Sequence, residues 1–503
     1  MKHVAMTLAA AAALAATPAL ADKKDGTVRF AYDQVLENID PFFNNVRLGV
    51  MMTQHVWDTL IYRDPVTNEY KPYLATAWKW LDDRTLELEL RQGIKFHNGE
   101  EFDADDVVYT LNYVSDPANK ATAQQNISWI EKAEKVEKFK VRIRARRNFP
   151  AAIEYLASAI PIHPNEYYAK AGPKGMNEKP VGSGPFKVTE HVVGKIIRLE
   201  RNADYWKGSP KSVPNVARVE IRMIPDRQTQ VAEMLSGGLD LIMNVPVEQA
   251  QQLKAAPHLS VTSGGTMRIV FVLFNAGENA PNPALKDVRV RRAIAHAIDK
   301  ETMAKQLVGE GVRVINSICF PAQFGCTDEG VPRYAYDPAK AKALLAEAGF
   351  ANGIDLEFFG YRERQQTEAM VNYLRAVGVR ANLKFMQYAA MRDQHRGNKV
   401  PASHQTWGSF NIMDTSASTS AYFKGIDDDM IKDPEIVALL QKGDTTVDPA
   451  VRKDAYKKAL TLISERAYAV PLYALTTYYV LNKDLDFKAH ADEMPRFWEM
   501  KWK

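Results

Sequence analysis

The chain has 503 residues, of which 46% are hydrophobic and 25% are charged. This length exceeds one ordinary domain, and the composition is that of a soluble globular protein with substantial cores. The 65 basic and 61 acidic residues leave a formal net charge of +4, which gives no reason to expect nucleic acid or an anionic membrane surface as a partner.

The first 21 residues predict a cleavable signal peptide. Lys2 precedes an alanine-rich apolar run over residues 4–16, and Ala19-Leu20-Ala21 fits the small-x-small rule of signal peptidase. The run is short for a membrane span, and no cysteine follows it to carry a lipid anchor. We therefore expect export to the periplasm, a mature chain that begins at Asp22 and no stable membrane insertion. A retained membrane anchor is the alternative.

Alternating and helix-periodic segments are mixed along the chain, which predicts an α/β protein. Strands are expected, in chain order, at residues 27–32, 86–91, 136–143, 195–201, 240–242 and 268–275. Helices are expected after the N-cap residue Asp103, over residues 226–236 and 288–307, and from Asp337 and Asp448 onward. In two of them, Pro338 and Pro449 follow the capping aspartate directly, as is typical of a first helical position.

Only two cysteines are present, Cys319 and Cys326. A close pair in an exported protein predicts a disulfide, which would contribute roughly 2–3 kcal/mol by closing a small loop. Free thiols or a metal site are the alternatives, although two cysteines without a nearby histidine make a poor zinc site.

No set of catalytic residues stands out. The sequence contains no H-E-x-x-H and no phosphate-binding Walker loop, and Pro185 follows Gly182-Ser183-Gly184 where a nucleophile elbow needs a helix. The chain is therefore expected to be no enzyme, with no metal and no cofactor. Trp407 and Phe410 lie instead in a segment rich in Ser, Thr and Asn, a composition that suits either a solute site or a packed loop.

Several segments together resemble the family 5 extracellular solute-binding proteins, which include peptide, glutathione and nickel binders. The clearest are Leu74-Ala75-Thr76-Ala77-Trp78, Leu90-Arg91-Gln92-Gly93-Ile94-Lys95-Phe96-His97-Asn98-Gly99 and Phe102-Asp103-Ala104-Asp105-Asp106-Val107-Val108-Tyr109. Further matches occur at residues 182–188, 199–206, 288–300, 336–350 and 471–473, so that the resemblance covers essentially the whole mature chain.

The resemblance implies a two-lobed periplasmic-binding-protein fold with a hinge and an additional small subdomain. Lobe I would combine residues 22–62, 178–266 and 479–503, residues 63–177 would form an insert, and residues 267–478 would form lobe II. The signature residues Leu86, Leu88, Phe96 and Val107 are expected in the core. The lobes would close on the solute and then dock on the permease of an ABC importer, with the protein acting as a monomer.

The ligand site is also implied by the resemblance. In the family's peptide binders, an Asp three residues after a second-lobe Trp pairs with the peptide's α-amine. Trp407 fits the Trp, but Phe410 stands at the Asp position. The candidate ligand-binding residues are Val35, Leu36, Glu37 and Asn38 from lobe I, Gln125 and Trp129 from the insert, and Trp407, Ser409, Phe410, Asn411 and Asp414 from lobe II.

Four functions are compatible with this pattern. The first is a substrate-binding protein for peptides or peptide-like solutes. The missing Asp favours a second one, a binder of oligosaccharide, opine or metal chelate. A periplasmic hydrolase or chaperone is a third, and a sensory module that presents solute to a membrane receptor is a further possibility that sequence does not separate from transport.

Overall fold

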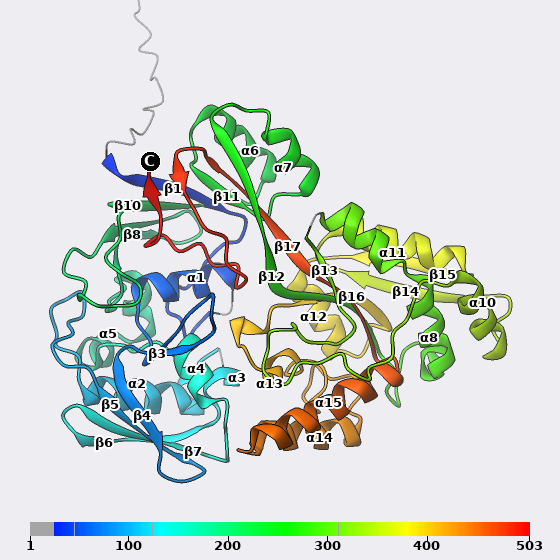
Figure 1. Cartoon of the computed structure of the whole chain (residues 1–503), viewed down its shortest axis with the longest axis horizontal. Helices are drawn as coiled ribbons and strands as arrows, with labels where there is room; N and C mark the ends of the chain where they lie inside the picture. Colours follow the sequence, from blue (N-terminus) through cyan, green and yellow to red (C-terminus); the bar gives the residue numbers. More distant parts are fainter. Residues whose placement is uncertain (1–24, 45, 123, 310) are drawn as a thin grey trace, which may run out of the picture.

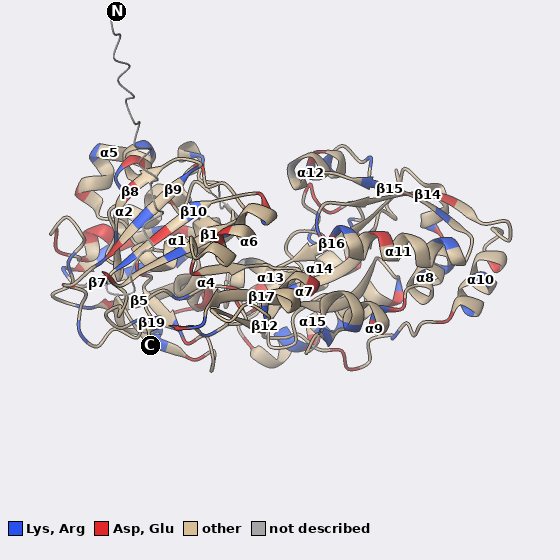
Figure 2. Ribbon diagram, turned by 90° about the horizontal axis from the view of Figure 1, so that it is seen from above, with Lys and Arg blue, Asp and Glu red and all other residues tan. Residues whose placement is uncertain are grey.

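A computed structural model describes residues 25–44, 46–122, 124–309 and 311–503, so the predicted signal peptide lies outside the described residues. Figure 1 shows two bodies side by side, joined in the middle by two long strands, β12 (Leu259–Phe274) and β17 (Ala469–Asn482). We call the body with the first strand, β1 (Thr27–Tyr32), lobe I and the other body lobe II. Both β1 and the C-terminal end of the chain belong to lobe I (Figures 1 and 2).

One sheet runs through both lobes. Its strand order is β15-β14-β16-β12-β17-β11-β1-β10-β9-β8, with β13 paired to β17. The remaining strands of this sheet are β8 (Phe186–Val192), β9 (Ile196–Arg201), β10 (Arg218–Met223), β11 (Leu241–Met243), β13 (Arg313–Val314), β14 (Ile354–Gly360), β15 (Val379–Phe385) and β16 (Ala402–Trp407). In lobe I, β1 is parallel to β10 and β11, and in lobe II, β14 is parallel to β15 and β16. β12 and β17 pair antiparallel along their length and so connect the lobes.

A smaller sheet of order β4-β5-β7-β6 forms a subdomain below lobe I in Figure 1. Its strands are β4 (Ala75–Trp80), β5 (Thr85–Leu90), β6 (Ile130–Glu137) and β7 (Lys140–Ala145), and its helices are α2 (Ala104–Ser115), η2 (Pro117–Asn119), α3 (Gln124–Ile127), α4 (Ala152–Ser158) and α5 (Asn165–Glu178). Short pairs are formed by β2 (Ile61–Arg63) with β3 (Tyr70–Pro72) and by β18 (Leu485–Asp486) with β19 (Lys501–Trp502).

The helices of lobe I are α1 (Arg47–Val56), α6 (Arg227–Ser236) and α7 (Val247–Leu253). Those of lobe II are η3 (Pro283–Lys286), α8 (Val288–Ala297), α9 (Lys300–Met303), η4 (Ala304–Val308), α10 (Pro338–Glu347), α11 (Arg364–Ala376), α12 (Tyr388–Arg396), η5 (Ser409–Asn411), α13 (Thr415–Ser418), α14 (Pro434–Thr445) and α15 (Pro449–Glu465). The four helices predicted at these places are confirmed, and in each the aspartate at the N-terminus, Asp103, Asp226, Asp337 or Asp448, accepts a backbone N–H of its helix.

Two predicted elements are wrong. The strand expected at residues 136–143 is a hairpin, because β6 ends at Glu137 and β7 begins at Lys140. The helix expected over residues 288–307 is broken after Ala297, where Asp299 caps the separate helix α9. In both cases the apolar pattern continues across the break.

Each part of the fold has its own apolar core. The four signature residues Leu86, Leu88, Phe96 and Val107 are all buried in the core of the small sheet, as predicted. The predicted disulfide between Cys319 and Cys326 is also present, with the two Cα atoms 5.8 Å apart. It lies beside the core formed by α14 and α15 in lobe II.

Candidate ligand-binding site

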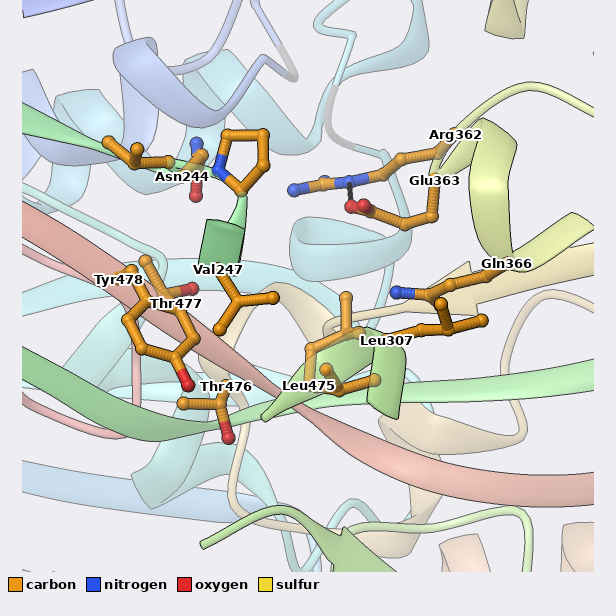
Figure 3. Close-up of a pocket in the computed structure, with 13 residues that line it drawn as sticks. Asn244, Val247, Leu307, Arg362, Glu363, Gln366, Leu475, Thr476, Thr477 and Tyr478 are labelled. Atoms are coloured by element: carbon orange, nitrogen blue, oxygen red, sulfur yellow. Dashed lines mark hydrogen bonds and ion pairs between the residues drawn. The ribbon is translucent and has the colours of Figure 1, made fainter. Parts of the chain in front are cut away.

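The loops that follow the parallel strands of the two lobes meet beside β17. In open α/β sheets, ligands bind outside the carboxyl ends of parallel strands. Here β11 of lobe I is followed by Asn244, and β14 of lobe II is followed by Tyr361, Arg362 and Glu363. Asn244, Arg362 and Glu363 line the same pocket, so this arrangement places a site between the lobes (Figure 3).

The pocket has a volume of about 80 Å³. Whole-ligand sites are typically several hundred Å³, whereas a dry cavity of ~150 Å³ accepts benzene. The pocket therefore suits one terminal group of a ligand. It is lined by Asn244, Val245, Pro246, Val247, Leu307, Val308, Arg362, Glu363, Gln366, Leu475, Thr476, Thr477 and Tyr478.

Arg362 is the main cationic group of the pocket. Its Nε donates to Glu363 Oε1 at 3.0 Å, whereas its two terminal nitrogens have no hydrogen-bond or ion-pair partner in the described part of the chain. Figure 3 shows the guanidinium pointing across the pocket toward the loop of Asn244. Burial opposes the charge of Arg362, but Glu363 and Glu493 raise its pKa above the usual range. A permanently charged fork with free N–H groups is suited to a carboxylate.

Gln366 and Thr476 add neutral polar groups to the same pocket. The Oε1 of Gln366 accepts from the hydroxyl of Tyr473 at 2.8 Å, and Figure 3 shows its amide nitrogen facing the pocket. The hydroxyl of Thr476 is buried and has no partner among the described residues. Together these groups supply hydrogen bonds that complement a charged terminal group.

A second charged cluster lies near the pocket, around Glu493. Arg47 of α1 and Arg268 of β12 bind its carboxylate at 3.1 and 3.3 Å, respectively. Burial alone would raise the pKa of Glu493, but Arg268, Arg47 and Arg362 together lower it to about 2. Glu493 is therefore ionised at neutral pH, and its charge is already neutralised by the protein.

The two lobes contact each other directly through Asn411. Arg47 of lobe I donates to Asn411 Oδ1 at 2.9 Å, and Arg63 donates to the Asn411 carbonyl at 2.7 Å. Two residues after Asn411, the Met413 N–H donates to Glu154 Oε1 of α4 at 2.8 Å. These bonds hold the loop after β16 against lobe I and its small subdomain, so the structure shows the lobes in contact.

Left-handed backbone conformations gather around the site. Asn244, Glu363, Ser409 and Asn411 have φ values of 60°, 52°, 51° and 65°. Such conformations are uncommon outside glycine and collect at functional sites, where the surrounding structure enforces them.

The predicted lobe I residues form the loop after β1. Leu36 is fully buried in the core, whereas Val35 and Glu37 are exposed and Asn38 is half-buried. The side chain of Glu37 has no partner in the residues that the structure describes, and its carbonyl faces Asn177.

The predicted residues of the small subdomain are Gln125 and Trp129. Gln125 belongs to the short helix α3. Trp129 is buried, donates to the Asn126 carbonyl at 3.0 Å and stacks on Phe149, with ring centroids 5.1 Å apart. The structure therefore places Trp129 in the core of the subdomain.

The predicted lobe II residues follow β16. Trp407 ends this strand, and its indole N–H donates to the Ala417 carbonyl at 2.9 Å. Ser409, Phe410 and Asn411 form η5, and of these Asn411 reaches lobe I.

Asp414 belongs to a buried network inside lobe II. Its carboxylate caps α13 through the Ser416 N–H and binds Arg452 Nη2 at 2.8 Å. The Tyr456 hydroxyl also donates to this carboxylate, and Asp414 is only 4% exposed. In this arrangement Asp414 has a cationic partner of its own.

Sequence reasoning did not find Arg47, Arg268, Arg362 or Glu493. A signal was present for two of them, because Arg362 lies two residues after an apolar strand and Arg268 interrupts another one. The other two lie far apart in the sequence and meet only in the fold.

In the described ranges, no group of three or more His, Cys, Asp or Glu residues is arranged to hold a metal ion. Among the same residues, no helix is both long enough and apolar enough to cross a membrane.

Comparison with known proteins identifies the family. Residues 69–429 match the model of the bacterial extracellular solute-binding proteins, family 5 Middle. The chain belongs to this family. It is accordingly an extracellular solute-binding protein.

Relatives of known function are similar over most of their length. Heme-binding protein A of Haemophilus influenzae is 26% identical over 84% of this chain and 82% of its own. The glutathione-binding protein GsiB of Salmonella typhimurium is 25% identical over 98% and 95%. The crystal structure of the dipeptide-binding protein from Pseudoalteromonas sp. SM9913 in complex with Met-Leu has a TM-score of 0.82 and 22% identity, and covers 95% of this chain and 100% of that one.

Proposed function

We propose that the chain is a periplasmic protein that captures peptides or peptide-like small solutes by closing its two lobes and delivers them to a membrane permease for import. The observation that carries this proposal is Arg362, whose terminal nitrogens have no partner among the described residues and lie in a pocket between the lobes. A peptide ends in a carboxylate, which a guanidinium fork binds through two parallel hydrogen bonds.

Relatives with peptide ligands support the same substrate class. They include Di/tripeptide-binding protein 1 of Pseudomonas aeruginosa, which is 25% identical over 85% of this chain, and GsiB, whose name states glutathione as its ligand. The predicted signal peptide supports a periplasmic location. We further propose that the protein acts as a monomer and is no enzyme.

A second candidate is a binder of opines, oligosaccharides or metal chelates. It is favoured by Phe410 at the family's Asp position and by the pairing of Asp414 with Arg452. Structures of the same fold were solved with mannopinic acid and with Ni(L-His), at 22% and 21% identity.

A thermal-shift screen tests both candidates. The mature protein is unfolded and refolded first, to remove solute carried over from the host. A solute at 100 times its Kd stabilises the protein by about 2.7 kcal/mol. Shifts with dipeptides and tripeptides support the first candidate, and shifts only with opines, sugars or chelates support the second.

The role of Arg362 is tested in the same assay. Arg362→Ala is expected to abolish the shift, because the ligand's carboxylate loses its only cationic partner in the pocket. Arg364→Ala is the matched control, since Arg364 is exposed and pairs with Glu368 on the surface of α11. Equal shifts in wild type and Arg362→Ala would contradict the assignment.

A further inference from the structure

The carboxylates around the site differ in whether the protein already neutralises them. Asp414 binds Arg452, Glu493 binds two arginines, and Glu363 binds Arg362. Asp414 and Glu493 are buried, so breaking their ion pairs in favour of a ligand's cation would be costly, and Glu363 is already bonded to Arg362 at 3.0 Å.

Asp33 is different. It follows β1 directly, at the carboxyl end of the parallel strands of lobe I. Its Oδ2 has one distant partner, Arg227 Nη2 at 3.5 Å, and its Oδ1 is shielded from solvent without any hydrogen-bond partner among the described residues. The Asp33 side chain as a whole is 34% exposed, so a ligand can reach the carboxylate and supply the donor that Oδ1 lacks.

The position of Asp33 is fixed relative to the pocket. Arg227, its partner, also donates to the Met243 carbonyl at 3.0 Å, and the next residue, Asn244, lines the pocket opposite Arg362. Burial lowers the pKa of Arg227, while Asp33, Tyr32 and Glu363 act to raise it, which agrees with a location facing lobe II. The pair Asp33–Arg227 of lobe I thus lies on the other side of the site from the pair Arg362–Glu363 of lobe II.

Glu37 is the competing carboxylate of the same loop. It is exposed, and no described residue binds its side chain. An exposed carboxylate gains little from an ion pair, because water and salt screen the interaction. The less exposed Asp33 is the stronger partner for a cation.

We propose that Asp33 is the specificity-determining carboxylate of this chain and binds a ligand's ammonium group from lobe I, while Arg362 binds the anionic end from lobe II. This inference rests on the proposed function. It moves amine recognition from the loop after Trp407, where Phe410 stands, to the loop after β1. The ligand class is a small zwitterion with a free amine.

Calorimetric titration with alanyl-alanine, trialanine and their N-acetylated forms tests the inference. Wild type is expected to bind the free amines roughly 10- to 100-fold more tightly than the acetylated forms, the size of one hydrogen bond to a charged group. Asp33→Asn has nearly the same shape and should lose most of this preference. Asp486→Asn, at the exposed Lys501 pair, is the matched control and should keep it.

The outcomes separate this inference from the proposed function. If the acetylated forms bind wild type as tightly, if Asp33→Asn keeps the preference, or if Glu37→Gln alone removes it, the assignment of Asp33 is overturned while peptide binding stands. If no form of either peptide binds wild type, both are overturned.

Discussion

Glu154 is expected to stabilise the contact between the lobes. Its carboxylate accepts the Met413 N–H of lobe II at 2.8 Å and the Tyr70 hydroxyl at 2.9 Å, and its side chain is only 2% exposed. Burial raises the pKa of Glu154, against the opposing effects of Arg63 and the Met413 N–H. Replacing Glu154 with alanine removes its hydrogen bond with the Met413 N–H.

The magnitude follows from the bond that is lost. A hydrogen bond to a charged group contributes about 1.5–3 kcal/mol, and 2 kcal/mol corresponds to about a 30-fold change in an equilibrium. In Glu154→Ala the equilibrium constant between the closed and open forms should fall by this factor. Any solute that binds by closing the lobes should then bind more weakly, by up to about 30-fold.

Two measurements check this expectation. Small-angle X-ray scattering of the solute-free protein should give a larger radius of gyration for Glu154→Ala, and calorimetry should give the weaker affinity. Glu131→Ala is the matched control, because its partner Arg144 and Glu131 itself are about half exposed, at 54% and 42%. An unchanged radius together with an unchanged affinity in Glu154→Ala would refute the reasoning.

Three further predictions concern stability, each measured by urea unfolding. Arg452→Met should lower the unfolding free energy by about 3–5 kcal/mol, because Asp414 is left buried without its cation; a loss below 1 kcal/mol would contradict this. Reduction of Cys319–Cys326 should cost about 2–3 kcal/mol by releasing a short loop, and the double serine variant should not respond to reductant. The pKa of His55 is lowered to about 3, mainly by burial, while its Nε2 accepts a backbone N–H. The contribution of neutral His55 to the free energy of unfolding is fully present above about pH 6.5. As the pH falls toward 3, it is lost at up to ~1.4 kcal/mol per pH unit, and His55→Gln should flatten this pH dependence.

The sequence was most informative where a local signal decides the structure. Asp103, Asp226, Asp337 and Asp448 cap helices because a short carboxylate reaches the free N–H groups of the first turn, an interaction within a few residues. The hairpin between β6 and β7 was missed because its turn, Lys138–Phe139, contains no glycine, proline or asparagine to mark it.

The site was less predictable because its charges come from distant segments. Arg47, Arg268 and Glu493 meet only after β12, α1 and the C-terminal segment have packed, so no spacing in the sequence announces them. The family resemblance predicts the loop with Asn411 as part of the site, and its contact with Arg47 became visible only in the fold.

The position of β17 has a consequence for biosynthesis. This strand comes near the end of the chain, at Ala469–Asn482, yet it lies between β11 and β12 in the middle of the sheet. Because the chain is synthesised from the N-terminus, β11 and β12 each keep an unpaired edge until β17 has been made. Such edges pair with other chains, which makes incompletely folded molecules prone to aggregate. A chain truncated before residue 469 would keep both edges unpaired and is therefore expected to aggregate, whereas in the complete chain β17 joins the two halves of the sheet in a late folding step.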